Sequence, residues 1–128
     1  MLNQTFSLPK DRIEILLLEG VHPSAVECFA ECGYTNVETL PGALPRAELE
    51  ERLERAFVVG IRSRTDLDAE LLQRASKLFA IGCFCIGTTQ VELEVAGDCG
   101  IPVFNAPHAS TRSVAELVLG EAVMLLRG

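Results

Sequence analysis

The stretch FVVGIRSRT, residues 57–65, joins a short apolar run to a polar segment. Its first part, residues 57–61, is apolar and rich in β-branched residues, which predicts a buried strand. Its second part contains Arg62, Ser63, Arg64 and Thr65, so that polar groups follow the predicted strand directly. Similar apolar runs on both sides of this stretch decide which fold it belongs to.

Four further runs of this kind predict strands at residues 13–18, 36–40, 78–81 and 101–104. Helical patterns separate them: one that ends at Gly33, one at 47–55, one from an N-cap at Asp68 to Ala75, and one at 91–99. Strands that alternate with helices in this way indicate a parallel sheet with right-handed crossovers. The prediction is an α/β fold: a flavodoxin-like open sheet of five parallel strands in the order 2-1-3-4-5, with helices on both faces.

The last predicted helix, residues 111–126, is apolar around nearly its whole circumference. Ser113 and Glu116 have the spacing of a capping box at its start. A helix of this composition is expected to be buried on all sides, with one side on the sheet and the other under a cover from elsewhere. We therefore expect a loose leader at residues 1–10, a domain at 11–110, and a helix at 111–128 that leads towards a further domain.

Charge and cysteine usage exclude several classes of function. The 128 residues carry 11 basic and 18 acidic side chains, a net charge of −7, and such an acidic chain is poorly suited to nucleic acids or anionic membranes. We see no membrane-spanning run and no signal peptide, so the five cysteines are expected to be reduced thiols in the cytoplasm. Their spacing does not fit zinc ligands, and we expect no metal site.

Two polar segments follow predicted strands, where ligands of doubly wound sheets bind. Residues 62–65 offer guanidinium and hydroxyl donors to an anion, although surface arginines paired with nearby acids would look the same. Residues 82–89 have the glycine spacing of a phosphate loop without its lysine. A glycine-flanked turn that directs backbone N–H groups at an anion stays open, but a plain tight turn is the preferred interpretation. His22 and His108 also follow strands and are candidate ligand contacts.

Five segments, residues 18–22, 60–65, 80–88, 101–107 and 111–117, together resemble the D-isomer-specific 2-hydroxyacid dehydrogenases, in particular the bacterial members that act on 3-phosphoglycerate. The resemblance implies that this chain is most of a substrate-binding domain. In the family, the catalytic arginine, glutamate and histidine and the NAD fingerprint lie in a second domain. The resemblance thus implies no catalytic residue in this chain, and no dehydrogenase activity for the 128 residues alone.

The resemblance also assigns residues. It implies substrate contacts at Arg62, Ser63, Arg64, Cys85, Ile86 and Gly87, and contacts with the cofactor NAD at Ile86, Ser110 and Thr111. The implied partners are a small anionic 2-hydroxy acid and, in the full-length protein, further copies of the same chain. Ser110 stands where these enzymes tend to have asparagine, which removes one polar contact near the cofactor.

Two alternatives remain open at this point. The chain could be a stand-alone anion-binding or regulatory domain that kept the fold and lost the chemistry. It could also be a truncated product with no role of its own. The retained arginines and the abrupt end at Gly128 favour truncation over an independent module.

Overall fold

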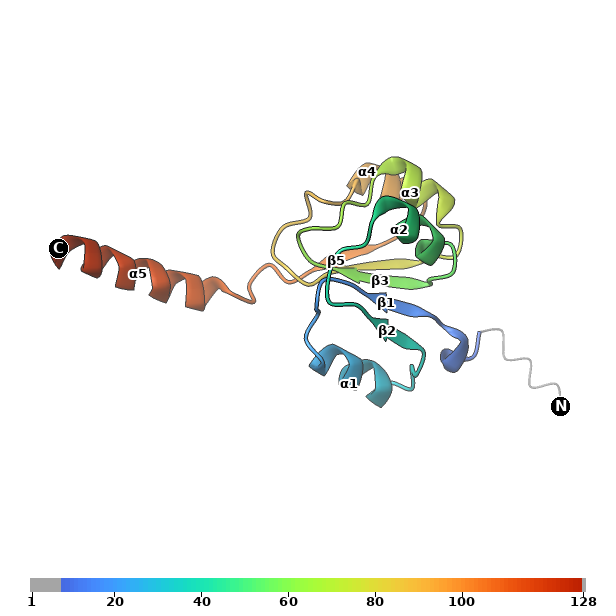
Figure 1. Ribbon diagram of the computed structural model, residues 1–128, viewed down its shortest axis with the longest axis horizontal. Coiled ribbons are helices and arrows are strands. Elements are labelled where there is room, and N and C mark those ends of the chain that lie inside the picture. Colours follow the sequence, from blue (N-terminus) through green and yellow to red (C-terminus); the bar gives the residue numbers. More distant parts are fainter. Residues whose placement is uncertain (1–7, 128) are drawn as a thin grey trace.

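The computed structural model describes residues 8–127 and contains one parallel sheet in the order β2-β1-β3-β4-β5 (Figure 1). The strands are β1 (Ile15–Leu17), β2 (Val37–Thr39), β3 (Val58–Ile61), β4 (Ala80–Cys83) and β5 (Val103–Asn105). Each neighbouring pair is parallel. The predicted fold class and strand order are confirmed.

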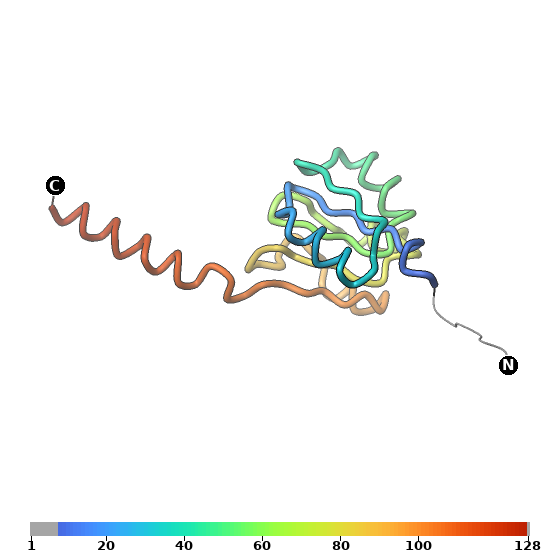
Figure 2. The backbone as a smooth tube through the Cα atoms, turned by 90° about the horizontal axis from the view of Figure 1, so that it is seen from below, coloured from blue at the N-terminus to red at the C-terminus, as the bar shows by residue number. Residues whose placement is uncertain are grey.

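Helices cover the two faces unequally, as Figures 1 and 2 show. The helices are α1 (Ser24–Glu31), α2 (Arg46–Leu53), α3 (Ala69–Arg74), α4 (Leu93–Asp98) and α5 (Thr111–Arg127), preceded by a 3-10 helix at Lys10–Arg12. α2, α3 and α4 lie on one face of the sheet, and α1 lies on the other beside β1 and β2. Most of the expected leader, residues 1–7, lies outside the described residues.

Alternation along β1 divides the apolar residues between two cores. Leu16 and Leu18 belong to the larger core under α2–α4, together with Val59 of β3. Ile15 and Leu17 belong to the smaller core under α1. Successive side chains of a strand point to opposite faces, so the unbroken apolar run is what a strand buried on both faces requires.

β4 runs two residues later than the sequence predicted. Leu78 instead ends the turn after α3, where its N–H donates to Ala75 O at 3.0 Å. The strand continues through Gly82 and Cys83, which pair with residues of β5.

The N-cap expected at Asp68 is confirmed, because its side chain accepts the N–H of Leu71 at 3.0 Å.

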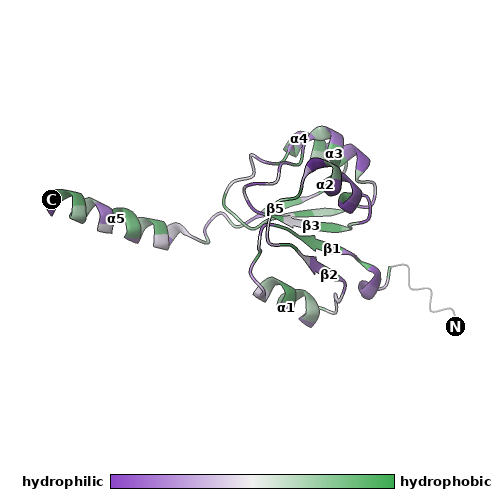
Figure 3. Ribbon diagram, viewed as in Figure 1, coloured by the Kyte–Doolittle hydropathy of each residue, from purple (hydrophilic) through white to green (hydrophobic). Residues whose placement is uncertain are grey.

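The last helix departs most from expectation. α5 extends away from the sheet (Figures 1 and 3), and none of its described residues is buried. Leu125 and Leu126 are 84% and 88% exposed, so the expectation that α5 is buried and covers the sheet is wrong. The physical reason is that residues 106–110 lead the chain away from β5, and a helix of 17 residues satisfies most backbone hydrogen bonds within itself.

The predicted capping box is also wrong. Ser113 lies inside α5 rather than at its N-cap, because the helix already begins at Thr111. Glu116 accepts instead from Arg112 Nε at 2.8 Å, a bond across one helical turn.

No helix within residues 8–127 is long and apolar enough to cross a membrane.

Candidate functional site

The carboxyl ends of the parallel strands meet at one edge of the sheet, and the segments that follow them form the candidate site. Residues 62–65 follow β3, residues 84–90 follow β4, and residue 19 lies just beyond β1. Because β1, β3 and β4 are neighbours in the sheet, these segments are brought side by side. The sequence-predicted substrate residues of the two loops therefore lie at a common edge.

Glu19 fixes the backbone of the loop that contains Arg62 and Arg64. Its carboxylate accepts the backbone N–H groups of Arg62 at 3.1 Å, Arg64 at 2.9 Å and Thr65 at 2.9 Å. The side chain is buried, with the residue 7% exposed, and its backbone is left-handed at φ 61°. A non-glycine residue in this conformation is strained by about 1 kcal/mol, which the three charge-assisted bonds offset.

The ionisation of Glu19 follows from these contacts. Burial raises the pKa of Glu19, but the Thr65 hydroxyl and the amides of Arg62, Arg64 and Thr65 lower it by more, so the pKa lies below its ordinary value. Glu19 is therefore a carboxylate at neutral pH. The Glu19 carboxylate is hydrogen-bonded by backbone amides and not by arginine side chains. The guanidinium groups of Arg62 and Arg64 therefore stay available to a ligand.

Gln90 and Cys85 join the two loops. Gln90 Nε2 donates to Arg62 O at 2.6 Å and approaches Gly87 O at 3.3 Å. Cys85 Sγ lies 3.5 Å from the same carbonyl of Arg62. The carbonyl of Arg62 is thus fixed by the β4 loop while its N–H is fixed by Glu19, so the position of this residue's backbone is determined from both sides.

The arginines of the loop differ from most others in the chain. Arg46, Arg52 and Arg74 each contact acidic side chains within 4 Å. Arg62 and Arg64 form no ion pair with any residue of the described part of the chain, although the protein is acidic. Exposed, unpaired guanidinium groups on a fixed backbone are suited to a bidentate contact with an anion.

The β4 loop offers backbone donors. Within residues 8–127, the N–H groups of Cys85, Ile86 and Gly87 donate to no backbone acceptor. The loop is held from the other side by β5, where Asn105 Nδ2 donates to Ile86 O at 2.7 Å and the Ala106 N–H donates to Cys85 O at 3.0 Å. A loop fixed at both ends with free N–H groups can orient a carboxylate.

Ser110 and Thr111, the residues expected near a cofactor, lie at the start of α5. The carbonyl of Ser110 accepts the N–H of Val114 at 2.9 Å, which begins the helix. Among the described residues, no hydrogen bond joins Ser110 or Thr111 to the loops after β3 and β4. The expected contact of these two residues with a cofactor therefore stays a prediction.

The cysteines of the β4 segment differ in environment. Cys83 is buried, and burial, with a smaller contribution from Cys85, raises the pKa of the Cys83 thiol to about 11. Cys83 therefore remains protonated at neutral pH and is a packing residue rather than a nucleophile. Cys85 is half-buried and acts as a hydrogen-bond partner within the loop.

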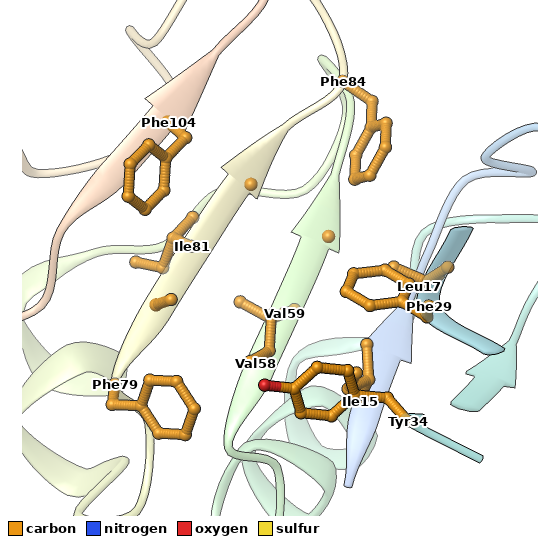
Figure 4. A pocket seen from close by; sticks show the side chains of 13 residues that line it. Ile15, Leu17, Phe29, Tyr34, Val58, Val59, Phe79, Ile81, Phe84 and Phe104 are labelled. Atoms are coloured by element: carbon orange, nitrogen blue, oxygen red, sulfur yellow. The ribbon is translucent and has the colours of Figure 1, made fainter. Parts of the chain in front are cut away.

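An apolar hollow of about 270 Å³ lies on the α1 face of the sheet, beside β3, β4 and β5 (Figure 4). Phe84, 41% exposed, forms its end nearest the candidate site. The ring lies so close to Gly60 that a Cβ there would come within 2.8 Å of Phe84 Cε2. Glycine at this position of β3 is therefore required for the ring to lie across the strand.

Two residues of the site were not found from the sequence. The pattern marks Glu19 only as the boundary of the first strand, yet an acidic residue directly before Gly20 at a strand end was a usable signal. Gln90 carries no signal of its own in the sequence. Its role depends on the fold of the loop, which no local pattern reveals.

Comparison with known proteins was consistent with this geometry. Residues 15–121 match the family model described as D-isomer specific 2-hydroxyacid dehydrogenase, catalytic domain. D-3-phosphoglycerate dehydrogenase of Escherichia coli strain K12 is 56% identical over 122 residues, 95% of this chain and 30% of that protein. The Haemophilus influenzae protein of the same name is 53% identical over 121 residues, again 30% of its length. The chain spans about 30% of the length of these curated relatives.

Solved structures show the same fold. The TT0316 protein from Thermus thermophilus superposes with a TM-score of 0.74 at 31% identity, covering 84% of this chain and 35% of that one. The NAD+-bound 3-phosphoglycerate dehydrogenase of Entamoeba histolytica gives a TM-score of 0.71 at 22% identity, covering 84% of this chain and 37% of that one, and so supports the fold alone. Because the family model matches residues 15–121, which is most of this chain, the chain belongs to the D-isomer specific 2-hydroxyacid dehydrogenase family.

Proposed function

We propose that this chain is the substrate-binding part of an NAD-dependent dehydrogenase that oxidises 3-phosphoglycerate to 3-phosphohydroxypyruvate. The observation that carries the proposal is that the guanidinium groups of Arg62 and Arg64 form no ion pair within residues 8–127 and stand on a loop whose backbone is fixed by Glu19. The names of the curated relatives, D-3-phosphoglycerate dehydrogenase, support this substrate over other 2-hydroxy acids.

The substrate has two anionic ends, a phosphate and a carboxylate. Arg62, Ser63 and Arg64 would hold one charged side of it, because this one loop carries two guanidinium donors and a hydroxyl donor. The free N–H groups of Cys85, Ile86 and Gly87 would orient the carboxylate. Fixing both ends would place the C2 hydroxyl, and this orientation is the contribution of the chain to the rate.

NAD, when bound, would supply the acceptor for a hydride from C2, and the hydroxyl proton would pass to a base. Ile86, Ser110 and Thr111 are the residues of this chain proposed to face it. Ile86 fits such a role, because its side chain is 48% exposed at the carboxyl edge of the sheet, where it offers apolar surface to a planar ring. The catalytic arginine, glutamate and histidine of the family are proposed to lie outside these 128 residues.

The wider setting is also proposed from the family. The reaction is the committed step towards serine, the protein is expected to work in the cytoplasm, and its full-length form is expected to be a homo-oligomer.

The test is an assay of NADH formation by the native polypeptide that contains this sequence. With NAD+ and 3-phosphoglycerate we expect NADH, and with D-lactate at the same concentration a much slower rate, because D-lactate has no phosphate. The isolated 128-residue polypeptide, assayed in parallel, is expected to form no NADH. Equal rates with both substrates would exclude the phosphorylated substrate as the preferred one.

A further inference from the structure

A second hollow, of about 400 Å³ and with both polar and apolar lining residues, opens beside the arginine loop at the carboxyl ends of β1 and β3. It is lined by Gly20, Val21, His22, Pro23, Arg62 and Phe84. β1 and β3 are neighbours in the sheet, and the strand order reverses between them. In open parallel sheets of this order, ligands bind at such a switch point.

The proton of neutral His22 is placed by its neighbour Ser24. The backbone N–H of Ser24 donates to His22 Nδ1 at 3.2 Å, and the Ser24 hydroxyl lies 2.8 Å from the same nitrogen. A ring nitrogen that accepts an N–H carries no proton of its own, so the proton lies on Nε2. Nε2 has no hydrogen-bond partner within residues 8–127.

The hollow therefore has two donors of different kinds and no acid among its lining residues. The guanidinium of Arg62 offers a fork of N–H groups, and His22 offers one further N–H. A carboxylate uses both of its oxygens in a bidentate contact with arginine. A phosphoryl group has a third oxygen for the imidazole, so the donor set is matched to phosphate.

We propose that His22 determines specificity for the phosphate end of the substrate, by donating from Nε2 to a phosphoryl oxygen while Arg62 holds the other oxygens. The inference rests on the proposed function and extends it to a residue outside the arginine loop. It also assigns the two ends of the substrate: the phosphate lies at the β1–β3 switch point, and the carboxylate lies towards the β4 loop.

The first test compares two substrates in the native polypeptide that contains this sequence. We expect His22→Leu to raise the KM for 3-phosphoglycerate about tenfold, because one hydrogen bond to a charged group is lost, and to leave its kcat nearly unchanged. The KM for D-glycerate, which lacks the phosphate, is expected to stay the same. His22→Gln, whose amide can donate from a similar position, is expected to restore most of the loss.

The second test separates this inference from the proposed function. Binding of inorganic phosphate is measured by NMR titration, with the imidazole nitrogens of the native polypeptide as the signal. We expect the Nε2 resonance of His22 to shift on saturation, and the affinity to fall about tenfold in His22→Leu. This result would support the phosphate site even if 3-phosphoglycerate were not oxidised.

Either of two results would overturn the inference. One is NADH formation from 3-phosphoglycerate with an unchanged KM in His22→Leu, which would leave the proposed function intact. The other is a His22 resonance that does not respond to phosphate, a measurement on the unmodified protein that does not depend on how the variants fold.

Discussion

Glu19 and Arg62 are 43 residues apart in the sequence, and a 3.1 Å bond from the Arg62 N–H to the Glu19 carboxylate joins them. The bond has two consequences. It fixes the arginine loop after β3 to the end of β1, and it satisfies a buried negative charge with backbone amides rather than with a guanidinium. The candidate site depends on both, since a carboxylate paired with the arginine side chain would compete with an anionic ligand.

The first prediction concerns the charge of Glu19. Glu19→Gln is expected to lower the free energy of unfolding at pH 7 by about 1–3 kcal/mol, because glutamine keeps one neutral acceptor oxygen and places an NH2 donor where the second carboxylate oxygen accepts a backbone N–H. The folded pKa lies below the ordinary value of 4.5, so the stabilisation is complete above that value and is lost as pH falls through the folded pKa. Urea denaturation of the protein and the variant between pH 7 and pH 3 should therefore show curves that converge at low pH.

Glu31→Gln is the matched control for this prediction. Glu31 is an exposed carboxylate at the end of α1, with no ion pair among the described residues. Its substitution should leave the stability within about 0.5 kcal/mol of the original. A stability difference for Glu19→Gln that stays constant down to pH 3 would contradict the proposed charge dependence.

A second prediction concerns the packing of Phe84 on β3. In Gly60→Ala the new Cβ would lie 2.6 Å from Leu17 Cδ2 and 2.8 Å from Phe84 Cε2, so the sheet or the ring must shift. We expect a loss of about 1–3 kcal/mol in thermal or urea denaturation. Gly120→Ala has nothing within 4 Å of its Cβ and is the control; it should be neutral or slightly stabilising in a helix. Equal effects would show that the ring does not lie over Gly60.

The N-cap of α3 gives a third prediction, which separates hydrogen bonding from charge. Asp68→Ala removes the acceptor for the Leu71 N–H and should cost about 1 kcal/mol in urea denaturation. Asp68→Asn keeps an acceptor oxygen but loses the ion pair with Arg46, and it should cost less, because exposed ion pairs contribute little. If the two variants were equally unstable, the charge rather than the cap would be responsible.

The fourth prediction tests the link between the loops. Gln90→Ala removes the donor to Arg62 O and to Gly87 O, so the β4 loop can move relative to the arginines. In the native polypeptide that contains this sequence, we expect the KM for 3-phosphoglycerate to rise several-fold. Gln73→Ala, at an exposed glutamine of α3, should leave it unchanged. If the KM were the same for both variants, the hydrogen bonds of Gln90 between the two loops would have no role in substrate binding.

The sequence was sufficient for the sheet because the apolar runs of β1 and β3 alternate with helices at regular spacing, which leaves few possible topologies. It was insufficient for α5. The sequence from Thr111 to Arg127 shows that the helix is apolar, but it does not show which other surface packs against the helix. The resemblance predicts roles for Arg62 and Cys85, whereas Glu19 and Gln90 act through bonds between distant segments that become visible only in the folded chain.

The most direct measurement is kcat/KM for 3-phosphoglycerate in the native polypeptide that contains this sequence, compared with Arg62→Leu and Arg12→Leu. Both arginines are exposed and without an ion pair among the described residues, but only Arg62 lies in the candidate site. We predict a loss of about 10- to 100-fold for Arg62→Leu and no change for Arg12→Leu. Equal kcat/KM values for Arg62→Leu and the unmodified protein would contradict the assignment of this loop as the substrate-anion site.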